Sequence, residues 1–225
     1  MISTISLKVG SSPGRVSTEI AATPVTVFVG PNNSGKSKLL SEIFSYCRAG
    51  KKNSLALLLD QVTFAPLSEE KANIATTAVL QPPSAGDSIR PGYICVGKGT
   101  EKHQLRKDQF LTYLTQPNEH SELFCPFFLK HHTLMLNGTT RLRLINEQSA
   151  GNLQRPPTTS LQVLLQNDDK RRVVREITRD AFGLYLVIDP TDLGKLRVRL
   201  SAREPKLPAE ERGIDAEAVA FHKKA

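Results

Sequence analysis

Four residues early in the chain, Gly30, Gly35, Lys36 and Ser37, match the fixed positions of the pattern G-x-x-x-x-G-K-[ST]. Glycines at these positions let the backbone curl so that successive N–H groups cradle an anion, and the positive end of a following helix dipole adds to the attraction. The lysine can then reach the β- and γ-phosphates, and the serine hydroxyl can bind Mg²⁺. The pattern therefore predicts a nucleoside triphosphate site. The residues assigned to the nucleotide are Gly30, Pro31, Asn32, Asn33, Ser34, Gly35, Lys36 and Ser37.

The residues on either side of this loop predict the elements that position it. Thr26–Val29 is a β-branched and aromatic run, which predicts a buried strand that ends at the loop. Apolar residues three and four positions apart in Lys38–Phe44 predict a helix that begins there. Alternating residues over 4–9 and 15–20 predict two earlier strands, so an antiparallel sheet is expected beside the nucleotide.

Further elements are expected downstream, and a single lobe over 1–225 is predicted. Its three parts are 1–60 (antiparallel strands, phosphate loop and first helix), 61–150 (an antiparallel subdomain) and 151–225 (a helical segment, a β-hairpin and the start of a further helix). The individual elements expected are a helix over 101–116, a hairpin around Asn137-Gly138 flanked by alternating leucines, a helical stretch over Ser160–Phe182, a hairpin formed by 184–188 and 195–201, and a helix from Pro208.

Composition limits the possible partners. A net charge of +8 and a pI near 9.5 attract polyanions by counterion release, which permits nucleic acid as a partner. The basic residues are scattered except for one cluster, Lys170, Arg171, Arg172 and Arg175, on a predicted helix. That cluster is either a phosphate contact or a solvated helix face balanced by nearby acidic residues.

The cysteines and the lack of long apolar runs bear on where the protein is expected to be located in the cell. Cys47, Cys95 and Cys125 lie far apart without metal-ligand spacing, which is typical of reduced thiols. No run of 18 apolar residues occurs, and the opening residues alternate between polar and apolar. We therefore expect a soluble, cytoplasmic protein without a membrane span.

Hydrolysis of a bound triphosphate needs a metal-supporting carboxylate after an apolar strand. Two stretches imitate that arrangement, one ending at Asp60 and the other at Asp189. Asp189 is the stronger candidate, but the alternating residues after Gly194 favour an antiparallel hairpin over a buried parallel strand. The sequence lacks N-K-x-D, the signature that reads guanine, which argues against a GTPase.

The order of these parts resembles the N-terminal lobe of ABC-type ATPase heads, in the group that includes the structural-maintenance-of-chromosomes, RecF-like and overcoming-lysogenization-defect ATPases. It looks especially like bacterial AAA-family ATP-binding proteins of that group. The residues that carry the resemblance are VTVFVGPNNSGKSKLLSEI (25–43), LMLNGTTRLRLI (134–145) and the run over 161–201. The resemblance implies an α/β P-loop NTPase fold with an antiparallel β subdomain and a helical segment.

The resemblance also implies roles for particular residues. Gln148, with Gln154 as the second choice, would touch Mg²⁺ and the attacking water, so Gln148 is assigned both a catalytic and a metal role beside Lys36. Lys38 would lie near the α-phosphate, and Asn33 would line the γ-phosphate edge. The family's second lobe supplies the signature serine segment, further carboxylates and a switch histidine, none of which is found here. The lobe is therefore expected to be incomplete, as a fragment or as one of two chains.

Three functions remain open from the sequence. The first is the ATP-binding lobe of an ABC-type ATPase that forms a homodimer around two ATP molecules with Mg²⁺ and couples hydrolysis to DNA- or nuclease-related work, as in antiphage defence. The second is a non-hydrolysing ATP-binding module for assembly or regulation. The third is a small P-loop phosphotransferase that uses Asp189.

Overall fold

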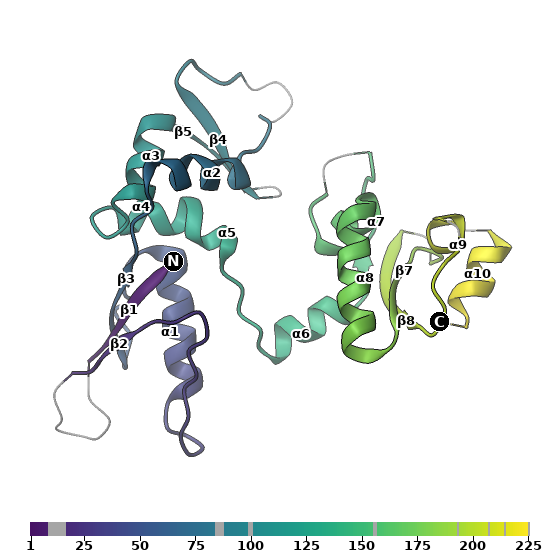
Figure 1. Cartoon of the computed structure of the whole chain (residues 1–225), viewed down its shortest axis with the longest axis horizontal. Coiled ribbons are helices and arrows are strands. Elements are labelled where there is room, and N and C mark those ends of the chain that lie inside the picture. The colour runs from purple at the N-terminus through teal and green to yellow at the C-terminus, as the bar shows by residue number, and fades with distance from the viewer. Residues whose placement is uncertain are drawn as a thin grey trace. The chain divides into compact units, whose positions relative to one another are not determined.

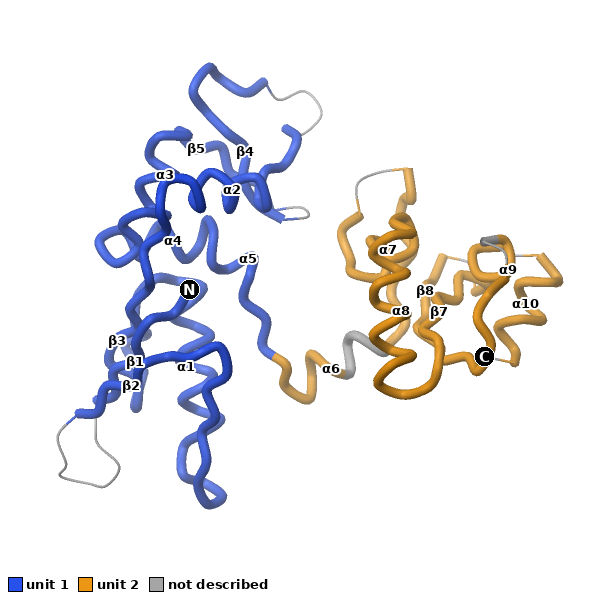
Figure 2. Tube along the Cα trace, viewed as in Figure 1, with its two compact units in different colours: residues 1–135 blue, residues 136–225 orange. Residues whose placement is uncertain are grey.

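The chain folds into two compact units. A computed structural model describes residues 1–8, 17–83, 88–98, 101–154, 157–192, 194–206, 208–213 and 215–224, with the backbone alone for 142–145 and 208. The first unit comprises Met1–Met135 and the second Leu136–Ala225 (Figure 2). The boundary falls inside the predicted subdomain 61–150, and each unit has its own buried core.

An antiparallel sheet of three strands lies at the start of the first unit (Figure 1). Its central strand β1 (Ile2–Leu7) pairs with β2 (Glu19–Ala21) on one side and with β3 (Leu59–Phe64) on the other. Two antiparallel strands thus precede the loop as predicted, but at 2–7 instead of 4–9 and at 19–21 instead of 15–20. Residues 9–16 lie outside the described residues. The helix α1 (Lys36–Ala49) shares a core with this sheet. Its core residues are Leu39, Ile43, Tyr46 and Cys47.

The rest of the first unit combines a hairpin with short helices. The strands β4 (Tyr93–Lys98) and β5 (Glu101–Arg106) pair in antiparallel register. The predicted helix over 101–116 is therefore wrong in its first half, because hydrogen bonds to β4 outweigh the helix propensity of these charged residues. The helices are α2 (Glu69–Val79), α3 (Lys107–Thr115), α4 (Ser121–Phe124), the π-helix η1 (Cys125–Leu129) and α5 (Lys130–His132).

The predicted hairpin around Asn137-Gly138 is wrong, since the helix α6 (Gly138–Ile145) occupies its second half. The side-chain oxygen of Asn137 accepts a hydrogen bond from the backbone N–H of Thr140 at 2.8 Å. The Asn137 carbonyl accepts the N–H of Arg141 at 3.0 Å. Asn137 therefore caps a helix where the sequence pattern predicted a turn. An asparagine side chain accepts nearby backbone N–H groups both at a helix N-cap and in a turn, so the residue type does not distinguish the two.

The second unit has a sheet of three antiparallel strands in the order β6-β8-β7. These strands are β6 (Gln148–Ser149), β7 (Tyr185–Asp189) and β8 (Lys195–Ser201). The pairing of β7 with β8 confirms the hairpin predicted for this part of the chain. The second core contains Leu161, Leu165, Ile188 and Leu196.

Helices predicted as continuous are divided in the second unit. The predicted stretch Ser160–Phe182 forms α7 (Ser160–Gln166) and α8 (Asp168–Phe182). Between them Asn167 ends the first helix and caps the second, its side chain accepting the N–H of Lys170 at 2.9 Å. The predicted helix from Pro208 is likewise divided into α9 (Pro208–Arg212) and α10 (Ala216–His222), the second capped by Asp215.

A buried ion cluster connects α8, α9 and β7. The Glu211 side chain is 3% exposed, and its carboxylate accepts a hydrogen bond from Arg175 at 2.7 Å and forms an ion pair with Arg171 at 3.1 Å. The backbone N–H of Ile188 also donates to it at 3.2 Å. Of the basic cluster, Arg171 is therefore buried and Arg175 half-buried beside Glu211, while Lys170 and Arg172 are exposed.

The three cysteines are free and buried. Burial raises the pKa of the Cys47 thiol to about 11 and that of Cys125 to about 12. Both are therefore thiols at neutral pH and weak nucleophiles. No helix in the described part of the chain combines the length and apolar character needed to cross a membrane.

Candidate functional site

The loop 30–35 is a tight turn that leads directly into α1. Asn33 adopts φ +64° and Gly35 φ +86°, both in the left-handed region, and Gly35 is the N-cap of the helix. A Cβ atom on Gly30 would lie 2.9 Å from the Ser34 hydroxyl, so the two ends of the loop approach closely. This curl requires residues that tolerate positive φ, which are the types that the sequence supplies.

The loop wraps around the side chain of Lys36. Its ammonium donates to the carbonyl oxygen of Gly30 at 2.7 Å, to that of Pro31 at 2.6 Å and to the hydroxyl of Ser34 at 3.1 Å. Carbonyl and hydroxyl oxygens are neutral acceptors, and a phosphate oxygen is a stronger partner for an ammonium because its hydrogen bonds are charge-assisted. A cationic group is thus held at the centre of the loop, where an anionic ligand can replace its present partners.

The start of α1 presents free donors beside this ammonium. The first backbone N–H groups of an α-helix have no partner within the helix. Among the described residues nothing accepts the N–H groups of Lys36, Ser37 and Lys38, no side chain caps the helix, and no acidic residue lies in its first turn. Within the same part of the chain the exposed Ser37 hydroxyl makes no hydrogen bond and is free to bind a cation. These groups fit a polyphosphate and its Mg²⁺.

The remaining predicted loop residues lie on the surface of the first unit. Pro31, Asn32, Asn33 and Ser34 are exposed. Lys38 is also exposed and lies 3.7 Å from the Glu42 carboxylate one turn further along α1. The loop, Lys36, Ser37 and Lys38 therefore form one continuous polar surface at the N-terminal end of α1.

The predicted buried strand before the loop is wrong. Thr26–Val29 belongs to no strand, and Val25, Val27 and Val29 are 78%, 71% and 86% exposed. Only Phe28 of this run packs against the first core. The reason is that a strand needs a hydrogen-bonding neighbour, and no described residue pairs with this segment.

Glu42 is a residue of the site that sequence reasoning missed. It is a buried carboxylate on the core face of α1, among Leu39, Ile43 and Tyr46. The signal was present, because an acidic residue at an apolar position of a helix is rarely buried without dedicated partners. Its partners are three backbone N–H groups, those of Leu57, Leu58 and Leu59.

The glutamines predicted beside Mg²⁺ lie in the second unit. Gln148 is half-buried in β6 and pairs in register with Leu196 of β8. Gln154 is exposed, and its backbone N–H donates to the side chain of Asn152 at 2.9 Å. The loop belongs to the first unit, so the roles of both glutamines stay predictions.

Both candidate carboxylates have partners in the structure. Asp60 is exposed and pairs with Lys52 at 2.6 Å, a contact that lowers the pKa of Asp60. Asp189 is 1% exposed and accepts from Thr191 at 2.6 Å and from Arg199 at 2.6 Å. Burial alone would raise the pKa of Asp189, but these hydrogen bonds outweigh it and hold the pKa below its ordinary value.

We expect Asp189→Asn to destabilise the second unit by about 1–3 kcal/mol, because Arg199 loses its charged partner. Since folding lowers the pKa of Asp189, its contribution is full above the ordinary carboxyl range near pH 4 and is lost as the pH falls below it. Thermal unfolding of the variant and the parent at pH 7 and pH 3 measures both effects. Equal stability at pH 7 would contradict this assignment.

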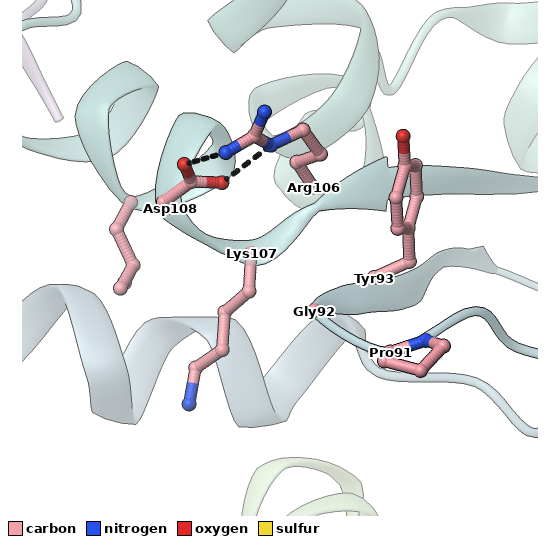
Figure 3. Close-up of a pocket in the computed structure, with 7 residues that line it drawn as sticks. Pro91, Gly92, Tyr93, Arg106, Lys107 and Asp108 are labelled. Carbon is pink, nitrogen blue, oxygen red and sulfur yellow. Dashed lines mark hydrogen bonds and ion pairs between the residues drawn. The ribbon is translucent and has the colours of Figure 1, made fainter.

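A cavity of about 560 Å³ lies at the junction of the β4–β5 hairpin and α3 (Figure 3). The charged groups at its rim include Arg106 and Asp108, which form two hydrogen bonds of 3.1 Å and 2.6 Å with each other. None of the loop residues lines this cavity, so it is separate from the predicted phosphate site. The residues lining it are Pro91, Gly92, Tyr93, Arg106, Lys107, Asp108 and Leu111.

Comparisons with known proteins add no family to these observations. No protein-family model, no curated protein and no solved structure matches the chain. Among the described residues, no group of three His, Cys, Asp or Glu side chains is placed to hold a metal ion.

Proposed function

We propose that residues 30–38 bind the phosphates of ATP together with Mg²⁺, as part of an ABC-type ATPase lobe. The observation that supports this proposal is the ammonium of Lys36 enclosed by the loop, next to N–H groups at the start of α1 that no described residue accepts. In this proposal the loop amides cradle the β-phosphate and Lys36 neutralises phosphoryl charge. Bound Mg²⁺ supplies charge neutralisation of the β- and γ-phosphates, and Ser37 is its ligand from this chain.

The exposed segment before the loop supports a further polypeptide partner. A run of β-branched and aromatic residues is typical of a strand buried on both faces of a sheet, yet Val27 and Val29 are largely exposed here. We propose that a second lobe or a separate chain covers this segment, and that the complete protein forms a homodimer across ATP. A role in DNA- or nuclease-related work, such as antiphage defence, follows from the resemblance and is part of the same proposal.

A second candidate function is ATP binding without hydrolysis. Asp60 pairs with Lys52, while Asp189 is held by Thr191 and Arg199, so the two carboxylates considered for catalysis already have partners. This arrangement favours a binding or regulatory module for the chain by itself. It also disfavours the phosphotransferase that would depend on Asp189.

Calorimetric titration of the chain with ATP, ADP and AMP in the presence of Mg²⁺ tests the nucleotide site. We expect saturable binding of ATP and ADP and none of AMP, because AMP lacks the β-phosphate that the loop amides surround. Absence of ATP binding, or equal binding of AMP, would contradict the proposal.

Phosphate release tests the non-hydrolysing candidate. We expect the chain alone to show no turnover of bound ATP above the buffer background. Asp189 is buried and held by Thr191 and Arg199, and Asp60 already pairs with Lys52. Turnover by the purified chain that disappears in Lys36→Ala would exclude the non-hydrolysing module.

A further inference from the structure

A single carboxylate on α1 binds three successive backbone N–H groups. Glu42 Oε1 accepts from Leu57 at 2.8 Å, while Oε2 accepts from Leu58 at 3.0 Å and from Leu59 at 2.8 Å. The Glu42 side chain is 6% exposed. Charge-assisted hydrogen bonds in a water-excluded position are strong and directional, so residues 57–59 are held firmly against α1.

The segment that Glu42 binds packs against the phosphate loop. A Cβ atom on Gly35 would lie 2.9 Å from Cδ1 of Leu58, so the Leu58 side chain contacts the end of the loop directly. Gly35 immediately precedes Lys36 and is the N-cap of α1 with φ +86°. The position of Leu58 therefore determines how much room the loop has at its turn into the helix.

The same segment connects the loop to the sheet. Leu59 is the first residue of β3 and is 1% exposed, and the Leu58 carbonyl accepts the backbone N–H of Lys8 at 2.8 Å. Glu42 thus joins α1, the start of β3 and the β1 side of the sheet around the base of the loop. Lys38, on the surface side of the carboxylate, is its cationic neighbour at 3.7 Å.

We propose that Glu42 is a positioning residue for the nucleotide, because its three hydrogen bonds keep Leu58 beneath Gly35 and so hold residues 30–37 in the conformation that receives phosphate. This inference rests on the proposed ATP site. Glu42 itself contacts no nucleotide and acts through Leu58 and the loop backbone.

Glu42→Gln tests the inference because a glutamine cannot replace both carboxylate oxygens. Its one carbonyl oxygen satisfies the donors on one side only, and its amide N–H groups face the remaining backbone N–H. Glu42→Asp keeps both oxygens and the charge and is the conservative variant. We expect the MgATP affinity by calorimetry to fall at least tenfold in Glu42→Gln and to be partly restored in Glu42→Asp.

Asn118→Ala is the matched control for a merely structural effect. Asn118 binds both backbone groups of Phe64 at the far end of β3, at 2.7 Å and 2.9 Å, and touches no loop residue. All variants are measured at a temperature where circular dichroism shows them folded. We expect MgATP affinity in Asn118→Ala to stay within twofold of the parent, and equal losses in both variants would overturn the inference.

Hydrogen exchange measured without nucleotide tests the positioning of the loop separately from ATP binding. We expect Glu42→Gln to speed exchange of the Leu39 N–H, which donates to the Gly35 carbonyl at 2.9 Å and so reports the turn of the loop into α1. We expect Asn118→Ala to leave this exchange unchanged. If the parent binds no ATP but Glu42→Gln loosens the loop, the proposed function fails and the positioning of the loop stands. Unchanged exchange in Glu42→Gln overturns the positioning role whether or not ATP binds.

Discussion

Lys36→Ala is expected to reduce the affinity for MgATP at least a hundredfold, which corresponds to about 2.8 kcal/mol. The ammonium is the cationic group that the loop surrounds, through contacts to Gly30, Pro31 and Ser34. Its removal takes away the charge-assisted hydrogen bonds that the enclosed ammonium would make to the phosphates, which the backbone N–H groups of the loop cannot replace. Calorimetric titration of the variant and the parent under identical salt conditions measures the loss.

The fold should survive this change, because among the described residues the Lys36 side chain makes hydrogen bonds only to the loop. Alanine is also a good helix former at the first position of α1. Lys51→Ala is the matched control, since Lys51 is an exposed lysine of the same unit whose one ion-pair partner among the described residues is Glu122, at 3.4 Å. We expect its affinity for MgATP to match that of the parent. Unchanged affinity in Lys36→Ala would defeat the assignment of the loop.

Gly50→Ala is expected to destabilise the first unit by about 4 kcal/mol or more, since large values of this kind arise from steric conflict with the backbone. Gly50 ends α1 with φ +74°, and its N–H donates to the Tyr46 carbonyl at 2.7 Å. A Cβ atom there would lie 1.9 Å from the carbonyl oxygen of Ser121, a backbone atom that cannot turn aside. The Ser121 hydroxyl also donates to the Gly50 carbonyl at 2.7 Å, which holds the two segments together.

Gly183→Ala separates this conflict from the cost of the left-handed conformation. Gly183 ends α8 with φ +70°, but nothing lies within 4 Å of its added Cβ. We therefore expect a loss of only about 1–2 kcal/mol, the cost of a left-handed alanine. Hydrogen exchange resolved by peptide reports the stability of each unit separately. Similar losses of stability in the two variants would show that the backbone at Ser121 can move away from a Cβ atom at position 50.

Local patterns predicted part of this molecule well. The loop at Gly30–Ser37 and the helix α1 were predicted because glycine, lysine and apolar spacing act within a few residues. The β7–β8 hairpin was predicted from two alternating runs close together in sequence. In each case the interactions that decide the conformation lie within the segment itself.

Where partners decide the conformation, local patterns were wrong. Residues 101–106 have helix-forming side chains but pair with β4, and Asn137-Gly138 has a turn signature but starts α6. Thr26–Val29 has the composition of a buried strand but has no strand beside it among the described residues. A strand forms only when another segment supplies its hydrogen-bonding partners. The propensities of its own residues do not say whether that segment is present.

The sequence by itself determined which residue types the loop brings together, since the glycines, the lysine and the serine of the phosphate-loop pattern lie within Gly30–Ser37. Only the tertiary structure decided what supports it: Glu42 binds Leu57, Leu58 and Leu59, and Gly50 meets Ser121, a residue 71 positions away. The physical reason is that every sequence carries the same backbone N–H groups. Which acceptor each N–H group finds, and which distant residues come into close contact, is decided only when the chain has folded.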